Sequence, residues 1–181
     1  MTHAKKFKGK LLEIHGLEAE ELRVADAEDL PYPDNFFDLV YSWGVLNHTA
    51  NIRQALAEIV RVVKPGGQGK IMVTHRFGLI AFYVWIRHAL LKARPWKSLT
   101  WCIENHLQSK GSKAFLPGEV RQLLHGLPVS GLEIKPVITY SDLLKQHQNR
   151  FLTALASIPA YLLGWDRAGF YLLINFRKNQ A

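Results

Sequence analysis

Hydrophobic and polar positions follow three successive patterns in the first half of the chain. The segments Glu21–Glu28 and Phe36–Gly44 are short, apolar or β-branched, and bounded by turn-forming residues, which predicts two strands. After Asn51 the apolar residues recur at helical spacing as far as Val63, so we expect a helix that Asn51 caps. The apolar run Gly69–His75 predicts another strand. The order strand, helix, strand predicts a βαβ unit with parallel strands.

The second half of the chain continues this alternation. We expect, in order, a helix over Phe77–Lys92, a polar stretch to Ser112, a helix over Pro117–His125, a strand over Leu132–Tyr140, a helix over Asn149–Leu163 and a closing strand over Gly169–Phe176. The longest apolar run, Phe77–Ile86, falls well short of the ~20 residues that a membrane span needs. It therefore predicts a buried or interfacial helix.

The composition is that of a globular protein, with 48% hydrophobic and 21% charged residues among 181. We therefore expect residues 1–181 to form a single domain with a sizeable core. The lone Cys102 cannot form an intrachain disulfide, which fits a reducing, cytoplasmic location. No arginine-rich run or RNA-type aromatic signature is present, so we expect no nucleic-acid partner.

The net charge of +8 is concentrated in the middle of the chain. Residues 61–125 hold eleven basic and two acidic side chains, whereas residues 21–60 hold two basic and seven acidic ones. A basic segment of this kind is typical either of solvated surfaces or of contact with an anionic membrane.

Candidate chemistry is expected just after each strand, because ligands of α/β sheets bind at the carboxyl ends of the strands. Three segments qualify: Asp26–Glu28, Ser42–His48 and Thr74–Arg76. The sequence has no G-x-S-x-G nucleophile motif and no histidine pair at metal-binding spacing, so we expect no metal. The cluster Gly66–Gly69 follows a helix and precedes a strand, the reverse of a phosphate-binding turn, which favours a helix stop.

The segment Val24–Val73 resembles the catalytic core of class I S-adenosylmethionine-dependent methyltransferases of the type 11 kind. The matching motifs are D-A-E-x-L-P-Y, F-D-x-V-Y, G-V-L-N-H and V-V-K-P-G-G, in the family's order and spacing. The resemblance implies an α/β fold with a Rossmann-like, doubly wound, mostly parallel sheet. It also implies S-adenosylmethionine as cofactor and methyl transfer to a small-molecule acceptor.

The resemblance assigns roles to particular residues. Asp26 and Ala27 match the family's adenine contacts, with a turn cap as the alternative for Asp26. Ser42, Trp43 and Gly44 would line the methionine side of the cofactor, with core packing as the alternative for Trp43.

Acid–base catalysis has one leading candidate in this sequence. We expect His48 to be the base that takes the acceptor's proton, with His75 and His106 as weaker candidates. The alternative for His48 is a loop histidine that packs locally.

The chain departs from the family pattern at its beginning. The family's acidic residue and G-x-G-x-G turn have no counterpart before Asp26, where only Gly9 and Gly16 occur. We therefore expect a partial, N-terminally truncated methyltransferase that lacks the first strands. The alternative is an inactive fragment or pseudo-enzyme that acts as the binding partner of another subunit.

Residues 77–112 are the expected lid or substrate-specificity insertion. Their mixture of aromatic and basic side chains suits an apolar or anionic acceptor. The stretch Phe77–Lys97 begins apolar and ends basic, so it predicts either a lid over the acceptor pocket or a helix in peripheral contact with a membrane.

Overall fold

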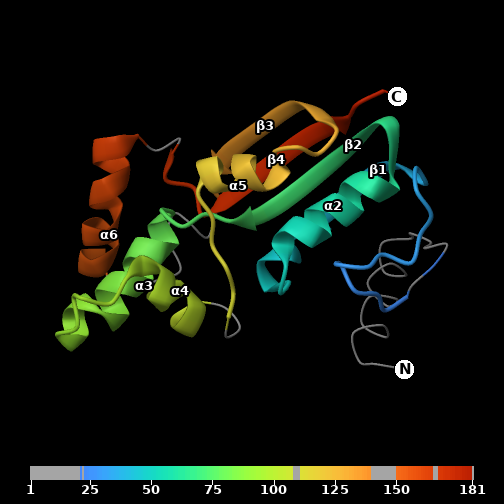
Figure 1. Ribbon diagram of the computed structural model, residues 1–181. Coiled ribbons are helices and arrows are strands. Elements are labelled where there is room, and N and C mark those ends of the chain that lie inside the picture. Colours follow the sequence, from blue (N-terminus) through green and yellow to red (C-terminus); the bar gives the residue numbers. More distant parts are fainter. Residues whose placement is uncertain (1–20, 22, 108–110, 140–149, 165–166, 181) are drawn as a thin grey trace.

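The computed structural model describes residues 21, 23–107, 111–139, 150–164 and 167–180 (Figure 1). The elements are β1 (Phe37–Trp43), η1 (Leu46–His48), α2 (Ile52–Val62), β2 (Val63–Thr74), α3 (Leu79–His88), η2 (Leu90–Lys92), α4 (Leu99–His106), α5 (Pro117–Leu124), β3 (Val129–Val137), α6 (Arg150–Leu163) and β4 (Tyr171–Lys178).

These strands form one mixed sheet in the order β1-β2-β4-β3. β1 and β2 are parallel and are joined by α2, which confirms the predicted βαβ unit. β4 runs antiparallel to both of its neighbours, β2 and β3. Among the described strands, β1 therefore lies at one edge of the sheet and β3 at the other.

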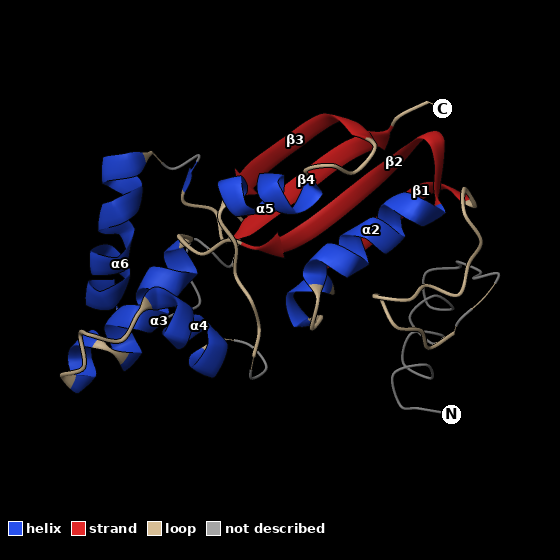
Figure 2. Cartoon of the chain, in the orientation of Figure 1, coloured by secondary structure: helices blue, strands red, loops and turns tan. Residues whose placement is uncertain are grey.

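The main core lies between one face of this sheet and the helices α2 and α5 (Figure 2). Asn51 begins α2 as predicted, because its side chain accepts a hydrogen bond of 3.2 Å from the amide of Gln54. The helix buries a stripe at helical spacing against alternate residues of β2 and β4: Ile52, Ala55, Leu56 and Ile59 against Ile71, Val73, Leu172, Ile174 and Phe176. Each such side chain contributes roughly 1.5–3 kcal/mol by leaving water.

The helices α3, α4 and α6 form a second body of structure beyond the carboxyl end of β2, which we call the helical lobe (Figure 2). α3 packs against both α4 and α6. Its buried side chains include Tyr83, Val84 and Ile86, so most of the apolar run Phe77–Ile86 is used inside the lobe. Within the described part of the chain, no helix is long and apolar enough to cross a membrane.

The expected bounds of a strand and of a polar stretch were wrong. The segment Glu21–Glu28 is not a strand: the described residues there form one isolated bridge, between Asp26 and Asp29. The Asp26 carboxylate accepts a hydrogen bond of 2.9 Å from the amide of Glu28, and this local turn replaces extended backbone. The stretch before Ser112 contains α4, which the side chain of Ser98 caps.

The glycines after α2 do not stop the helix. α2 ends at Val62, and Val63 already has extended dihedral angles. Gly66, with φ of +76°, and Gly67 lie inside β2, where the pairing with β1 is irregular. A Cβ on Gly67 would lie 2.8 Å from the carbonyl oxygen of Asp38, so the close approach of β1 requires glycine at this position.

Candidate active site

The carboxyl end of β1 carries three of the predicted cofactor residues. Ser42 is buried, whereas Trp43 is half exposed and its ring stacks near Tyr41 and lies 6.2 Å from the ring of Tyr171. Gly44 has φ of +65°, which L side chains rarely adopt, and its amide donates to the carbonyl of Met72 at 3.2 Å. The chain therefore turns away from the sheet at Gly44, as a ligand-binding loop after a strand must.

Asn47 joins the ends of the two parallel strands, a role that sequence reasoning missed. Its side chain is 1% exposed. Its Nδ2 donates to Thr74 Oγ1 at 2.8 Å, and its Oδ1 accepts from the amide of Thr74 at 3.1 Å. These buried hydrogen bonds fix the loop after β1 to the last residue of β2. Buried asparagines have no sequence signature, which is why this contact could not be predicted.

His48, the predicted base, lies on the surface of the same loop. It is exposed, and its Nδ1 shares a hydrogen bond of 3.2 Å with Ser112 Oγ. The Lys113 ammonium group donates to the carbonyl oxygens of Thr49 and Ala50 at 3.0 and 2.6 Å. Residues 112 and 113, in the segment between α4 and α5, therefore hold the His48 loop in place.

Asp26 and Ala27 belong to a turn that α2 holds beside this loop. Asp26 is exposed, and Ala27 packs against the main core. The Glu28 carboxylate accepts a hydrogen bond of 2.8 Å from the amide of Asn51, the residue that begins α2. The turn thus lies near the carboxyl end of β1, although it is not itself part of the sheet.

An ion-pair network, also missed by sequence reasoning, holds the loop that follows this turn. Arg61 donates to both carboxylate oxygens of Glu58 at 2.8 Å and to the carbonyls of Leu30 and Tyr32 at 2.9 and 2.8 Å. Glu58 also accepts from the amide of Leu30 at 2.9 Å. The hydrogen bonds that Arg61 donates lower the pKa of Glu58, and their acceptance by Glu58 and Asp34 raises the pKa of Arg61.

His75, the first residue after β2, is buried and hydrogen-bonded to the backbone just before β4. His75 is 4% exposed, its amide donates to the carbonyl of Phe170 at 2.7 Å, and its Nδ1 lies 2.8 Å from the carbonyl oxygen of Gly169. A carbonyl can only accept, so the Nδ1 proton of His75 is held in this bond. Arg76 pairs with Glu119 at 2.9 Å and fixes the start of α5 to the same strand end.

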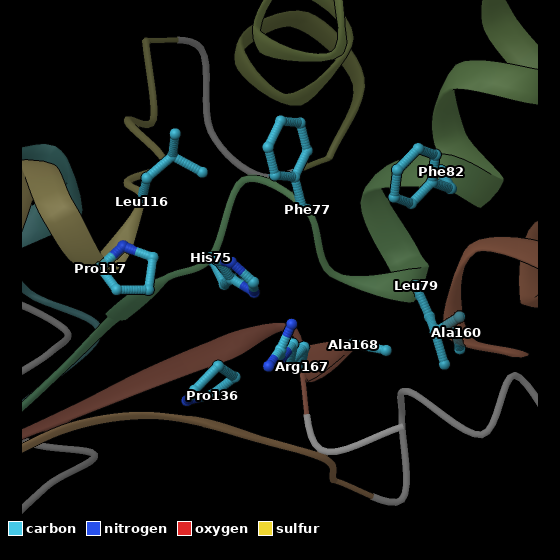
Figure 3. Close-up of a pocket in the computed structure, with 10 residues that line it drawn as sticks. All are labelled: His75, Phe77, Leu79, Phe82, Leu116, Pro117, Pro136, Ala160, Arg167 and Ala168. Carbon is cyan, nitrogen blue, oxygen red and sulfur yellow. The ribbon is translucent and has the colours of Figure 1, made fainter. Parts of the chain in front are cut away.

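A cavity of about 480 Å³ opens beside His75 (Figure 3). Most of its lining is apolar and comes from the end of β2, α3, the start of α5 and α6: Phe77, Leu79, Phe82, Leu116, Pro117 and Ala160. His75 and Arg167 bring polar groups into it. Such a volume and lining suit a small apolar ligand with an oxygen atom. Sequence reasoning found His75 and the aromatic residues but missed Leu116 and Arg167.

Close backbone packing at two glycines brings the walls of this cavity together. A Cβ on Gly169 would lie 2.3 Å from the carbonyl group of Val137, and one on Gly78 would lie 2.5 Å from Cα of Phe170. Neither gap admits a side chain. These glycines therefore let the end of β2, the end of β3 and the start of β4 converge.

His106 lies away from both strand ends. Its ring stacks on His88 at 4.2 Å, with 15° between the ring planes. His88 is the last residue of α3, roughly 15 Å along the helix from its start beside the cavity. Desolvation and the His106 ring lower the pKa of His88. The expectation of a base at His106 therefore has no support from the geometry.

Within the described ranges, no group of three or more histidine, cysteine or acidic side chains could hold a metal ion. We assign no metal ligands.

Sequence comparison finds similarity to a known family in the first part of this chain. Residues 3–69 match the family model described as a methyltransferase domain. The ubiquinone/menaquinone biosynthesis C-methyltransferase UbiE of Cupriavidus taiwanensis is 55% identical over 51 residues, 28% of this chain and 20% of that protein. The demethylmenaquinone methyltransferase of Bacillus cytotoxicus is 27% identical over 130 residues, 67% of this chain and 53% of that protein.

Relatives with other acceptors match as well. A tRNA (carboxymethyluridine(34)-5-O)-methyltransferase of Arabidopsis thaliana is 48% identical over 60 residues, 32% of this chain and 15% of that protein. The chain thus spans about half the length, or less, of these curated relatives. Because the relatives' acceptors differ, the similarity alone does not name the acceptor.

Structural comparison extends the match over the whole chain. An S-adenosylmethionine-dependent methyltransferase from Methanosarcina mazei superposes with a TM-score of 0.58 at 16% identity, covering 100% of this chain and 80% of that one. The [4+2]-cyclase SpnF superposes with a TM-score of 0.57 at 16% identity, covering 98% and 63%. Family model and fold together confirm the predicted resemblance: residues 3–69 match a methyltransferase domain, and the chain has the fold of class I S-adenosylmethionine-dependent methyltransferases.

Proposed function

We propose that this chain is part of an enzyme that transfers a methyl group from S-adenosylmethionine to a ring carbon of an apolar quinol. The observation that carries the proposal is the apolar cavity beside His75, at the carboxyl end of β2. The names of the quinone methyltransferases among the relatives support the same acceptor class.

The two strand ends are close enough to serve donor and acceptor in one reaction. Trp43 of β1 pairs in register with Met72 of β2, and Asn47 hydrogen-bonds Thr74 directly. A methyl group transfers only when donor and acceptor atoms are held in line at roughly 3–3.5 Å. A cofactor at the end of β1 and an acceptor at the end of β2 satisfy the need for adjacent sites.

The Asp26 turn suits the adenosyl part of the cofactor, and the end of β1 suits the methionine part. The exposed Asp26 carboxylate can accept a hydrogen bond from an exocyclic amine, and the left-handed turn at Gly44 lets a ligand approach the backbone. When bound, S-adenosylmethionine supplies an electrophilic methyl group, which a nucleophilic carbon takes with release of S-adenosylhomocysteine.

The chain's own residues then have two tasks. The apolar cavity holds the acceptor and excludes water, and the insertion 77–112 acts as its lid, since Phe77, Leu79 and Phe82 line the cavity. The proton that the ring carbon loses passes to a base, for which we propose His48, oriented by Ser112. His75 lies in the cavity lining and is proposed to position the acceptor's oxygen.

A second candidate function rests on the edge of the sheet. β1 has a described neighbour on one side, and its Tyr41 and Trp43 side chains are 62% and 50% exposed. This edge suits pairing with another subunit. An inactive chain that completes such a partner would bind it without transferring methyl groups.

The test is methyl transfer from methyl-labelled S-adenosylmethionine to a demethylated naphthoquinol with a short isoprenoid tail. We expect label in the organic extract, a higher KM in Phe82→Ala, and a lower kcat in His48→Ala. Phe151→Ala, an exposed aromatic on α6, is the control and should leave both constants unchanged. Transfer to tRNA instead of quinol would contradict the acceptor class, and no transfer to any acceptor would favour the second candidate.

A further inference from the structure

An exposed segment that carries both apolar and basic side chains lies at the tip of the helical lobe, just after α3. Residues 90–96 are all exposed and project beyond the packed helices, at the lower left of Figure 1. They include Leu91 and Trp96, which are 61% and 74% exposed. Exposed apolar side chains that gather in one patch mark interaction sites.

The charge of this tip points to the kind of partner that covers it. No acidic residue occurs between Phe77 and Ile103, whereas Arg87, Lys92 and Arg94 are exposed in that range. In the described part of the chain, none of these three cations takes part in an ion pair. Large apolar side chains between unpaired cations match a lipid surface, where the apolar groups enter the acyl boundary and the cations meet lipid phosphates.

A second apolar strip lies on the neighbouring helix α6. At about 100° per residue, Phe151, Ile158 and Leu162 fall within an arc of ~40°, and Ala160 points to the opposite side. Ala160 is fully buried, whereas the other three are exposed. Leu155, one turn after Phe151, packs against the cluster that contains Tyr83 and Ala89, so α6 packs beside α3. The strip thus lies on a helix of the same lobe as the tip.

We propose that the tip, residues 90–96, together with the exposed Arg87, docks the protein on an anionic phospholipid bilayer, with the outer strip of α6 as a second contact. The apolar run Phe77–Ile86 is largely buried, so the contact is made by the exposed segment that follows it rather than by the helix itself. Docking here leaves the cavity at the start of α3 roughly 15 Å along the helix from the bilayer contact. The proposal concerns binding alone and does not depend on methyl transfer.

Co-sedimentation with lipid vesicles tests the proposal without cofactor or acceptor. At low salt the chain should bind vesicles that contain phosphatidylglycerol and leave phosphatidylcholine vesicles unbound, and added salt should weaken the binding. Lys92→Gln/Arg94→Gln should weaken it by roughly 30-fold, given the contribution of each cation near a charged membrane.

Matched controls separate this tip from the general positive charge. Arg121→Gln/Arg177→Gln removes two exposed cations, one from α5 and one from β4, and should change binding less than about threefold. Leu91→Ser/Trp96→Ser should weaken binding at least tenfold, by roughly the transfer free energy of the buried side chains. Tyr41→Ser removes an exposed aromatic of β1 and should have no effect.

Three outcomes would overturn the proposal. The first is absence of binding to phosphatidylglycerol vesicles at low salt. The second is equal binding to phosphatidylcholine vesicles. The third is an equal loss of binding in the Lys92/Arg94 and Arg121/Arg177 variants, because attraction would then come from diffuse charge. Unfolding temperatures of all variants, expected to match the parent because every altered side chain is surface-exposed, show whether any loss reflects misfolding.

Discussion

The carboxyl ends of β1 and β2 are neighbours in one parallel pair, yet they are built from different interactions. Beyond β2, buried apolar groups and close backbone contacts enclose a cavity. Beyond β1, the predicted cofactor residues lie at the strand end and on the Asp26 turn, and hydrogen bonds hold the backbone there. The acceptor side is therefore set by packing, whereas the cofactor side is set by polar contacts that respond to pH and salt.

The largest loss of unfolding free energy should come from a substitution beside the cavity at the end of β2. Gly169→Ala would place a Cβ 2.3 Å from the carbonyl group of Val137, so β3 or β4 must shift. We expect a loss of about 3 kcal/mol of unfolding free energy, measured by urea denaturation. Gly118→Ala, in open space on α5, is the control and should be neutral or stabilising. Equal losses of unfolding free energy in the two variants would contradict the close packing of Gly169 against Val137.

A smaller loss of unfolding free energy is expected at Asn47, which joins the carboxyl ends of β1 and β2. Asn47→Ala removes both hydrogen bonds to Thr74 and leaves the Thr74 amide buried without its acceptor. Urea denaturation should show a loss of about 2 kcal/mol. Asn105→Ala, which removes an exposed hydrogen bond to the carbonyl of Trp101, is the matched control and should cost much less. A neutral Asn47→Ala would mean that the strand ends are not coupled through this side chain.

The smallest effect on stability concerns pH and the Glu58 contacts that hold the loop after the Asp26 turn. Glu58 has a pKa below its usual value in the folded state, so its contribution to stability is present above the unfolded pKa and is lost as the pH falls through the folded pKa. Glu58→Gln should cost about 1 kcal/mol at neutral pH and should flatten the decline of stability in acid. Amide exchange should show the loop around Leu30 opening in acid before the cavity around His75. Simultaneous opening of both would contradict the contrast between the two ends.

The same contrast explains what the sequence could and could not predict. The βαβ unit was predictable because the period of apolar residues changes sharply at Asn51 and again near Gly69. Such local patterns determine elements and their order. The strand expected at Glu21–Glu28 failed because a strand needs a partner, and a local pattern carries no information about whether a neighbouring strand is present.

The candidate site was less predictable, because it is assembled from distant segments. Loop residues after β1 could be assigned by family motif, but Asn47 and Arg61 act through partners 27 to 31 residues away in sequence. The cavity joins the end of β2 to Leu116 and Arg167, which no motif marks. Pockets between elements depend on tertiary packing, so their lining residues emerge only from the structure.

Nuclear magnetic resonance titration tests the division between the two strand ends most directly, and it detects weak binding. S-adenosylhomocysteine, the cofactor product, should shift the amides of Asp26, Ala27 and residues 42–48. A demethylated naphthoquinone with a short isoprenoid tail should instead shift residues 75–82, together with Leu116 and Ala168. Separate sets of shifted amides would support a cofactor site at β1 and an acceptor site at β2. Overlapping sets, or no shift at residues 42–48 with S-adenosylhomocysteine, would contradict it.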